Sequence, residues 1–176
     1  YFNLSGEGDG CTILDHELLL DAPYITPTDS ELIPHGEFRA VKGTPFDFTA
    51  PKTVGKDDGA RATDTDMSYG GGYDHCFVFD KSRDKAEPYA VLYSAESGIE
   101  MKCYTDMPAV QFYAGNCLDQ KGKNGHYYGR CGGLCLETQA IPNNVNVSKY
   151  AAYGSSIYDA GEVYRFTAKY AFGIRK

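Results

Sequence analysis

Short runs of apolar residues, each bounded by turn-forming residues, recur along the whole chain. Runs of this length are typical of β-strands, in which successive side chains point to opposite faces. The runs that predict strands are Glu17–Leu20, Asp74–Phe79, Tyr89–Ala95, Ile99–Thr105, Ala109–Gly115, Gly133–Gln139 and Val163–Phe172. Only Ser148–Ser156 is suited to a helical turn or two. Strands at this density predict an all-β sandwich or barrel, and we take the antiparallel sandwich as the expectation.

The last run, Val163–Phe172, alternates most regularly. Tyr164, Phe166, Ala168, Tyr170 and Phe172 share one face, and Arg165, Thr167 and Lys169 share the other. This alternation predicts a half-buried antiparallel strand, with its aromatic face toward the core.

The segment Lys56–Gly72 has no such pattern. It is rich in aspartate, glycine and other small residues. This composition predicts a mobile surface loop, and long loops of this kind are either functional or disordered.

The chain of 176 residues is 42% hydrophobic and 23% charged, which is ordinary for a globular protein. No repeat or linker divides it, so residues 1–176 are expected to belong to one domain. The formal net charge of -7 repels phosphate backbones, so we do not expect nucleic acid as a partner. No apolar run approaches the roughly 20 residues of a membrane span, so we expect no membrane partner either.

Six cysteines permit disulfides without requiring them. Cys76, Cys103 and Cys135 lie in apolar runs, where a thiol behaves as a small core residue. We therefore expect reduced cysteines and a cytoplasmic protein. The sequons at Asn3 and Asn146 would fit a secreted protein equally well.

The run Gly133–Gln139 carries an unusual pair of polar residues. Leu134 and Leu136 point to one face, whereas Cys135, Glu137 and Gln139 point to the other. A carboxylate and an amide on a partly apolar strand are expensive to desolvate unless a ligand uses them. An ordinary exposed sheet face explains them as well, and on the pattern alone it is the better explanation.

Two further polar positions interrupt predicted strands. Asp74 and His75 are consecutive, so on a strand they point to opposite faces and cannot form a catalytic dyad. Asp74 follows a glycine-rich turn and would either line the rim of a site or simply favour the turn. Gln111 and Tyr113 share a face, and an amide beside an aromatic ring is a common arrangement in sugar sites.

A metal site would have to use Cys131, Cys135 and His126. On one strand the two cysteines would lie about 13 Å apart, too far for a shared tetrahedral ion. Only a bend at Gly132 and Gly133 would bring them close enough. The chain also lacks the usual zinc and phosphate-loop motifs. We therefore expect neither a metal nor a nucleotide cofactor.

Seven short motifs occur in an order and spacing that resemble the second half of the aldose 1-epimerase (galactose mutarotase) family. They are Tyr1–Gly6, Asp15–Leu18, Leu32–Glu37, Gly43–Asp47, Gly72–His75, Val110–Asn116 and Cys135–Gln139. The resemblance runs from Tyr1 to about Phe172. It implies a large antiparallel β-sandwich, of which residues 1–176 would be the carboxyl-terminal part of a single domain.

The resemblance also implies an activity, the interconversion of the α and β anomers of free aldohexoses such as galactose or glucose. In that family the glutamate of the Leu-Glu-Thr-Gln motif is the general base, a role that falls on Glu137. The aspartate that hydrogen-bonds sugar hydroxyls corresponds to Asp74, and the glutamine that lines the sugar pocket corresponds to Gln111. We expect Glu137 to be partly buried. Acid–base chemistry of this kind requires no metal and no nucleotide.

One departure from the family pattern concerns the general acid. The family's acid is a histidine two residues before the Tyr-Phe-Asn-Leu motif, and none of His16, His35, His75 or His126 matches it. We therefore expect the amino-terminal half of the same protein as a partner that supplies the acid. The alternative is a carbohydrate-binding module with an epimerase-like fold and no catalytic activity.

Overall fold

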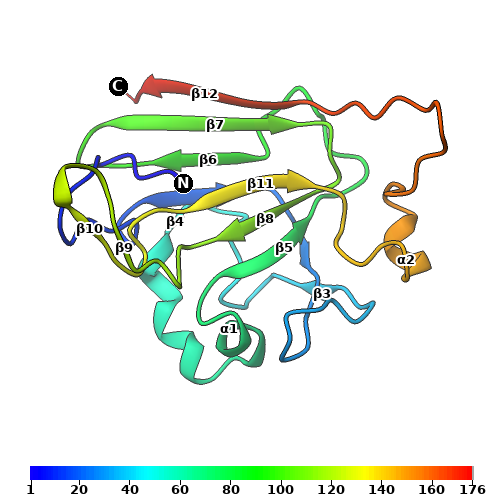
Figure 1. Ribbon diagram of the computed structural model, residues 1–176, viewed down its shortest axis with the longest axis horizontal. Coiled ribbons are helices and arrows are strands. Elements are labelled where there is room, and N and C mark those ends of the chain that lie inside the picture. Colours follow the sequence, from blue (N-terminus) through cyan, green and yellow to red (C-terminus); the bar gives the residue numbers. More distant parts are fainter. Residues whose placement is uncertain (176) are drawn as a thin grey trace.

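Two five-stranded sheets form the body of the computed structural model, which describes residues 1–175 (Figure 1). One sheet has the order β12 (Ala168–Ile174), β7 (Ile99–Thr105), β6 (Ala90–Tyr93), β1 (Glu17–Leu20), β4 (Lys52–Thr53). The other has the order β11 (Cys135–Gln139), β8 (Ala109–Tyr113), β5 (Asp74–Val78), β2 (Tyr24–Ile25), β3 (Arg39–Ala40). Every pairing within the two sheets is antiparallel.

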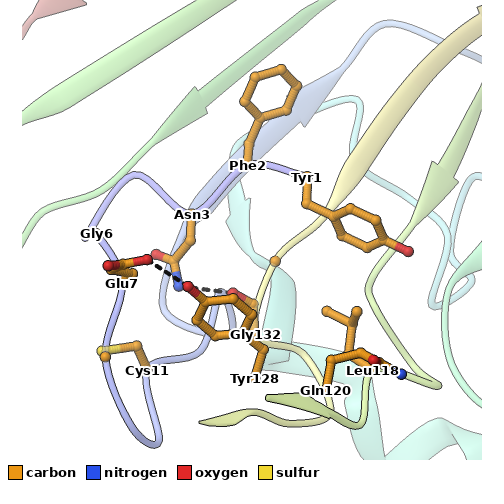
Figure 2. A pocket seen from close by; sticks show the side chains of 12 residues that line it. Tyr1, Phe2, Asn3, Gly6, Glu7, Cys11, Leu118, Gln120, Tyr128 and Gly132 are labelled. Carbon is orange, nitrogen blue, oxygen red and sulfur yellow. Dashed lines mark hydrogen bonds between the residues drawn. The ribbon is translucent and has the colours of Figure 1, made fainter. Parts of the chain in front are cut away.

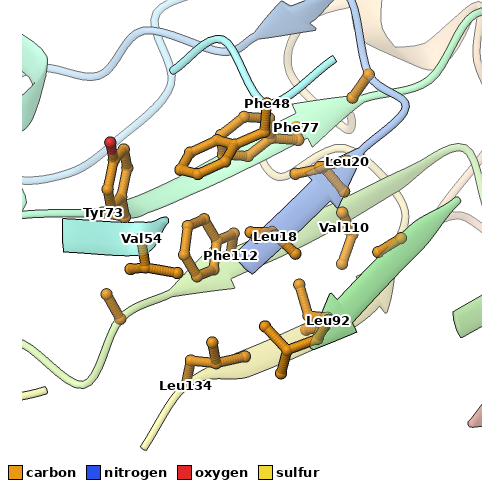
Figure 3. Packing of buried hydrophobic residues seen from close by; sticks show 14 of the residues in the cluster. Leu18, Leu20, Phe48, Val54, Tyr73, Phe77, Leu92, Val110, Phe112 and Leu134 are labelled. Atoms are coloured by element: carbon orange, nitrogen blue, oxygen red, sulfur yellow. The ribbon is translucent and has the colours of Figure 1, made fainter. Parts of the chain in front are cut away.

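The core lies between the two sheets, where alternate side chains from each meet (Figure 3). Leu18 of β1 and Leu92 of β6 pack in one cluster with Phe77 of β5 and Phe112 of β8, and all four are fully buried. The ring of Tyr73 stacks on Phe112 with the centroids 5.2 Å apart. Burying each large apolar side chain contributes roughly 1.5–3 kcal/mol. The predicted antiparallel sandwich is thus confirmed.

The predicted strands are present, and most are a residue or two shorter at one or both ends than their apolar runs. The exception is the last one. The strand β12 begins at Ala168 and not at Val163, and its face is not half-buried, because Phe172 is 58% and Ile174 is 67% exposed. The strand pairs only with β7 and forms the edge of its sheet. Tyr170 packs against the core and Phe2 lies beside Tyr170 and Phe172, but Phe172 and Ile174 remain largely exposed within residues 1–175. Alternation alone does not show how much of a strand's apolar face is covered.

The segment predicted as a loop, Lys56–Gly72, is instead largely helical. It contains the end of a 3-10 helix, η1 (Val54–Ala62), and the helix α1 (Thr65–Tyr69). Its aspartates have structural partners: the Asp64 side chain accepts from the Met67 N–H at the start of α1, and Arg39 bonds to both Asp64 and Asp66. The prediction of an unstructured loop was wrong because composition does not show which charges are paired.

A short helix, α2 (Ser148–Ala151), lies where a helical turn was predicted. Together with Ile141, its residue Tyr150 packs on Val78 and Ala109, which point outward from the second sheet. Residues 141–153 therefore cover part of the outer face of that sheet and leave the rest open. The remaining elements are η2 (Lys123–Gly125) and a small hairpin of β9 (Gln120–Lys121) and β10 (Tyr127–Tyr128).

All six cysteines are free. Cys76, Cys103 and Cys135 are buried, as expected for core thiols. Within residues 1–175, no helix has the length and apolar character required to cross a bilayer.

Candidate functional site

The three residues singled out from the sequence lie on neighbouring strands of the second sheet. Glu137 is on β11, Gln111 is on β8 and Asp74 is the first residue of β5. In the antiparallel register Glu137 is directly opposite Gln111, and Gln111 is in turn opposite Cys76. Because side chains alternate along a strand, these residues share the outer face, while Leu136 and Phe112 point into the core.

A chain of hydrogen bonds runs across this face. The Gln111 amide nitrogen donates to Asp74 Oδ1 at 2.7 Å, and its carbonyl oxygen accepts from Gln139 Nε2 at 3.3 Å. An amide has one donating and one accepting end, so the two contacts together set its orientation. The structure therefore brings Asp74 and Gln111 together in direct contact, with Glu137 across from Gln111.

Glu137 itself is exposed, and the expected partial burial is not found. Leu134 and Leu136, which are buried, lie on the other side of the strand. Over Glu137 the outer face remains open in residues 1–175, whereas residues 141–153 cover it farther along. A carboxylate on an open polar face can accept a proton from a bound ligand.

Tight packing of the turn before β5 positions Asp74. Gly72 has φ of +142°, and a Cβ atom there would lie 2.4 Å from the Asn116 Oδ1 atom. The Asn116 amide in turn donates to the carbonyl oxygens of Gly70 at 2.8 Å and Tyr73 at 3.0 Å. Glycine is needed here both for the backbone conformation and for the close approach, so the Gly-rich turn serves to place Asp74.

His75 lies behind Asp74, on the core side of the strand, as the alternation predicted. Its Nδ1 atom accepts from the Asp74 N–H at 3.0 Å, and its Nε2 atom lies 3.2 Å from the Asp66 carbonyl oxygen. With Nδ1 accepting, Nε2 carries the proton and donates it to Asp66. Burial lowers the pKa of His75, and the nearby Asp66 and Asp74 only partly oppose that shift. The neutral His75 ring therefore holds the Asp74 backbone in place through this hydrogen bond.

Tyr1 borders the site on the side of β11. The backbones of Phe2 and Leu134 exchange two hydrogen bonds, of 2.7 and 2.9 Å, on the free edge of β11. The Tyr1 ring lies edge-on to Tyr113, with the centroids 6.3 Å apart. Partial burial, the Cys135 thiol and the carboxylates of Glu137 and Asp74 all raise the pKa of the Tyr1 hydroxyl. Tyr1 thus belongs to the same polar surface.

A cavity of about 420 Å³ adjoins Tyr1 on its other side, between the first residues of the chain and the segment around the β9–β10 hairpin. Figure 2 shows the Tyr1 and Phe2 side chains pointing in different directions, with Tyr128 bonded to Glu7 and Asn3 bonded to Gly132 across the cavity. The walls of this cavity include few charged groups, so it offers less acid–base chemistry than the face that carries Glu137.

The other candidates from the sequence do not gather at this face. His16 is buried and its Nε2 atom accepts from the Leu4 N–H at 2.8 Å, while His126 lies 3.7 Å from Asp9 on the β9–β10 side. His35 is exposed in the connection between β2 and β3. Among residues 1–175, no three His, Cys, Asp or Glu side chains are grouped to hold a metal ion.

Two residues of the site region escaped sequence reasoning. Thr26 and Thr28, just after β2, line a small cavity beside Asp74 and Gln111. The alternation of Ile25, which is in the core, with Thr26 was visible in the sequence. The sequence did not show that Thr26 faces the site, because β2 has only two residues and pairs with β5, a strand far along the chain.

Comparisons with known proteins bear on this arrangement. The family model described as aldose 1-epimerase matches residues 1–171. The galactose mutarotase of Sus scrofa is 38% identical over 99% of this chain, and the aldose 1-epimerase of Escherichia coli is 33% identical over 98%. The crystal structure of a GalM/aldose epimerase homologue from C. elegans superimposes with a TM-score of 0.80 at 27% identity, covering 94% of this chain and 47% of that one. The chain spans about half, 48%, of the length of the two relatives.

Proposed function

Because the chain belongs to the aldose 1-epimerase family, we propose that it is the carboxyl-terminal part of a single-domain mutarotase. The complete protein would interconvert the α and β anomers of free aldoses such as galactose or glucose. Glu137 would be the general base, and Asp74 and Gln111 would hold sugar hydroxyls. The relatives named galactose mutarotase and aldose 1-epimerase support this proposal.

One observation carries the assignment of roles. Glu137 stands across from Gln111 on an open face, and Gln111 is hydrogen-bonded to Asp74. The group offers a carboxylate base beside a paired amide and carboxylate, which together present both donors and acceptors. Sugar hydroxyls require such mixed partners, since each hydroxyl both donates and accepts.

The reaction uses these groups directly. Glu137 accepts the proton of the anomeric hydroxyl while the ring oxygen gains a proton from an acid, and the C1–O5 bond breaks to give the open-chain aldehyde. Rotation about the C1–C2 bond exposes either face of the aldehyde. Return of the two protons in the reverse sense closes the ring as either anomer. The step therefore needs a base at the anomeric hydroxyl and an acid at the ring oxygen.

The acid is proposed to come from residues that precede Tyr1. The pairing of Phe2 with Leu134 supports this. In an antiparallel pair, each step back along one strand is matched by a step forward along the other. Because Phe2 is opposite Leu134, a strand that continued before Tyr1 would bring the second residue before Tyr1 opposite Glu137. From the resemblance to the family, we expect the histidine that acts as general acid at that position. Directly opposite residues have Cα atoms about 4.5–5.5 Å apart, close enough for both to act on one sugar.

A second candidate function is a carbohydrate-binding module without catalysis. The observation that favours it is the location of the four histidines, since His16 and His75 are buried and His35 and His126 lie away from Glu137. Within residues 1–175, the Asp74–Gln111 pair would then bind sugar and Glu137 would have no acid to work with.

Polarimetry on freshly dissolved α-galactose and α-glucose separates the two candidates. We expect the complete protein to accelerate mutarotation and the 176-residue chain alone to give little or no acceleration. If the chain alone were as active as the complete protein, the proposal of an acid before Tyr1 would fail. If the complete protein bound sugar without accelerating mutarotation, the protein would be a carbohydrate-binding module and not an enzyme.

A further inference from the structure

A cavity of about 110 Å³ lies beside the hydrogen-bonded Asp74 and Gln111 side chains. The segment that follows β2 forms one wall of it, and the site strands form the other. The lining residues are Thr26, Thr28, Leu32, Pro34, Asp74, Cys76, Gln111 and Pro142. One water molecule occupies a volume of about 30 Å³ in the liquid, and pockets that bind whole small molecules have volumes from about 300 Å³ upward. The cavity therefore suits one polar substituent of a ligand whose body lies outside it.

Two threonine hydroxyls in its wall lack partners. Thr26 is 0% and Thr28 is 9% exposed, and neither Oγ1 atom makes a hydrogen bond with any of residues 1–175. Thr26 lies against the Cys76 thiol, which is a weak partner. Buried hydroxyls are nearly always satisfied, so two such groups in one wall indicate that a polar ligand belongs there.

The backbone holds both threonines firmly in this wall. The Thr26 N–H donates to the Cys76 carbonyl at 3.0 Å, which continues the pairing of β2 with β5. The Thr28 N–H donates to Asp66 Oδ1 at 3.4 Å. Turning a threonine side chain from one χ1 rotamer to another exchanges a hydroxyl and a methyl group of similar size. Both threonines line the cavity, so their unpartnered hydroxyls can bond to a group that enters it.

Position in the sheet indicates which part of a sugar reaches this cavity. Strands lie about 4.8 Å apart, and the order β11-β8-β5-β2 puts the threonines three strands from Glu137. A pyranose with its anomeric oxygen at Glu137 would lie across Gln111 and Asp74. Its substituents on the side away from the anomeric carbon would then point toward Thr26 and Thr28.

We propose that this cavity is a subsite for one hydroxyl or hydroxymethyl substituent of the aldose, remote from the anomeric carbon. Thr26 and Thr28 are then specificity-determining residues that donate to or accept from that substituent. The inference rests on the proposed function, because it takes Glu137 as the anchor for the anomeric oxygen. It explains why hydroxyl-bearing residues, and not valine, fill two buried positions beside the Asp74–Gln111 pair.

The test uses Thr26→Val and Thr28→Val in the complete protein, with exposed Thr12→Val as the matched control. Valine has the shape of threonine without its hydroxyl, so thermal unfolding should show no loss of stability. We expect at least one of the two variants to lower kcat/KM about 3- to 10-fold, the size of one neutral hydrogen bond, for galactose or glucose. The same variant should have no effect on the 4-deoxy or 6-deoxy analogue that lacks the contacted hydroxyl.

Two results would overturn the subsite. One is an unchanged kcat/KM in both variants, which would indicate that the cavity holds water and no part of the sugar. The other is an equal loss for every sugar and analogue, which would indicate a general structural effect. Calorimetric titration with the same sugars separates this inference from the proposed function. If sugar binding depended on Thr26 or Thr28 as expected but mutarotation was absent, the proposal of the subsite would stand and the proposed mutarotase activity would be wrong.

Discussion

At the scale of single residues, His75 links the core to the polar face. Its ring is 0% exposed and bonds to the Asp74 backbone on one side and to the Asp66 carbonyl on the other. A proton added to Nδ1 would place two donors against each other at Asp74. Protonation of the folded chain is therefore unfavourable both because of burial and because of this contact.

This predicts a loss of stability in mild acid. Burial lowers the pKa of His75 in the folded state, so below its unfolded pKa of about 6.5 the unfolded chain binds a proton that the folded chain does not. The free energy of unfolding should therefore fall as the pH drops from about 6.5 to 5. His75→Gln should show a shallower fall in melting temperature over this range, whereas exposed His35→Gln should follow the wild type. Parallel curves for wild type and His75→Gln would contradict the assignment.

The orientation of these residues was predictable, and their surroundings were not. The two-residue period placed Asp74 and His75 on opposite faces and put Glu137 with Gln139, because it depends only on backbone geometry. The hydrogen bond from Gln111 to Asp74 joins residues 37 positions apart. Such a contact follows from strand order, which the local pattern does not contain.

At the scale of elements, the region that includes η1 and α1 shows the limits of composition. Asp64 accepts from the Met67 N–H at 3.2 Å and pairs with Arg39, whose guanidinium also reaches Asp66. These contacts lower the pKa of Asp64, chiefly through the hydrogen bond from Arg39. They turn a polar, glycine-containing segment into ordered helix next to the turn that carries Asp74.

Two substitutions of Asp64 separate its hydrogen bond to the start of α1 from its ion pair with Arg39. Asp64→Ala removes both and should destabilise the fold by about 1–3 kcal/mol, since a lost N-cap costs about 1 kcal/mol and Arg39 also loses a partner. Asp64→Asn keeps a good capping side chain and loses only the charge, so its effect should be smaller. Urea unfolding of the two variants measures the difference, with exposed Asp15→Ala as the control. Equal losses in Asp64→Ala and Asp64→Asn would assign the whole effect to the ion pair.

At the scale of the whole molecule, the predicted sandwich is present, and its edge strand β12 has an exposed apolar face. Phe172 and Ile174 on β12 are largely exposed, and Phe2 packs beside Phe172 and Tyr170. Exposed apolar edges of this kind promote association. We propose that the amino-terminal part of the same protein covers them, which agrees with a chain that spans 48% of its curated relatives.

The central claim, that Glu137 is the general base of a mutarotase, is tested most directly by Glu137→Gln in the complete protein. Glutamine keeps the shape and the hydrogen-bonding capacity of the side chain but cannot accept the anomeric proton at neutral pH. Polarimetry should show kcat lower by about 10²–10⁴-fold, with sugar binding largely retained. Glu96→Gln, at an exposed position in the turn between β6 and β7, should behave as wild type. An unchanged rate in Glu137→Gln would remove this residue from the mechanism.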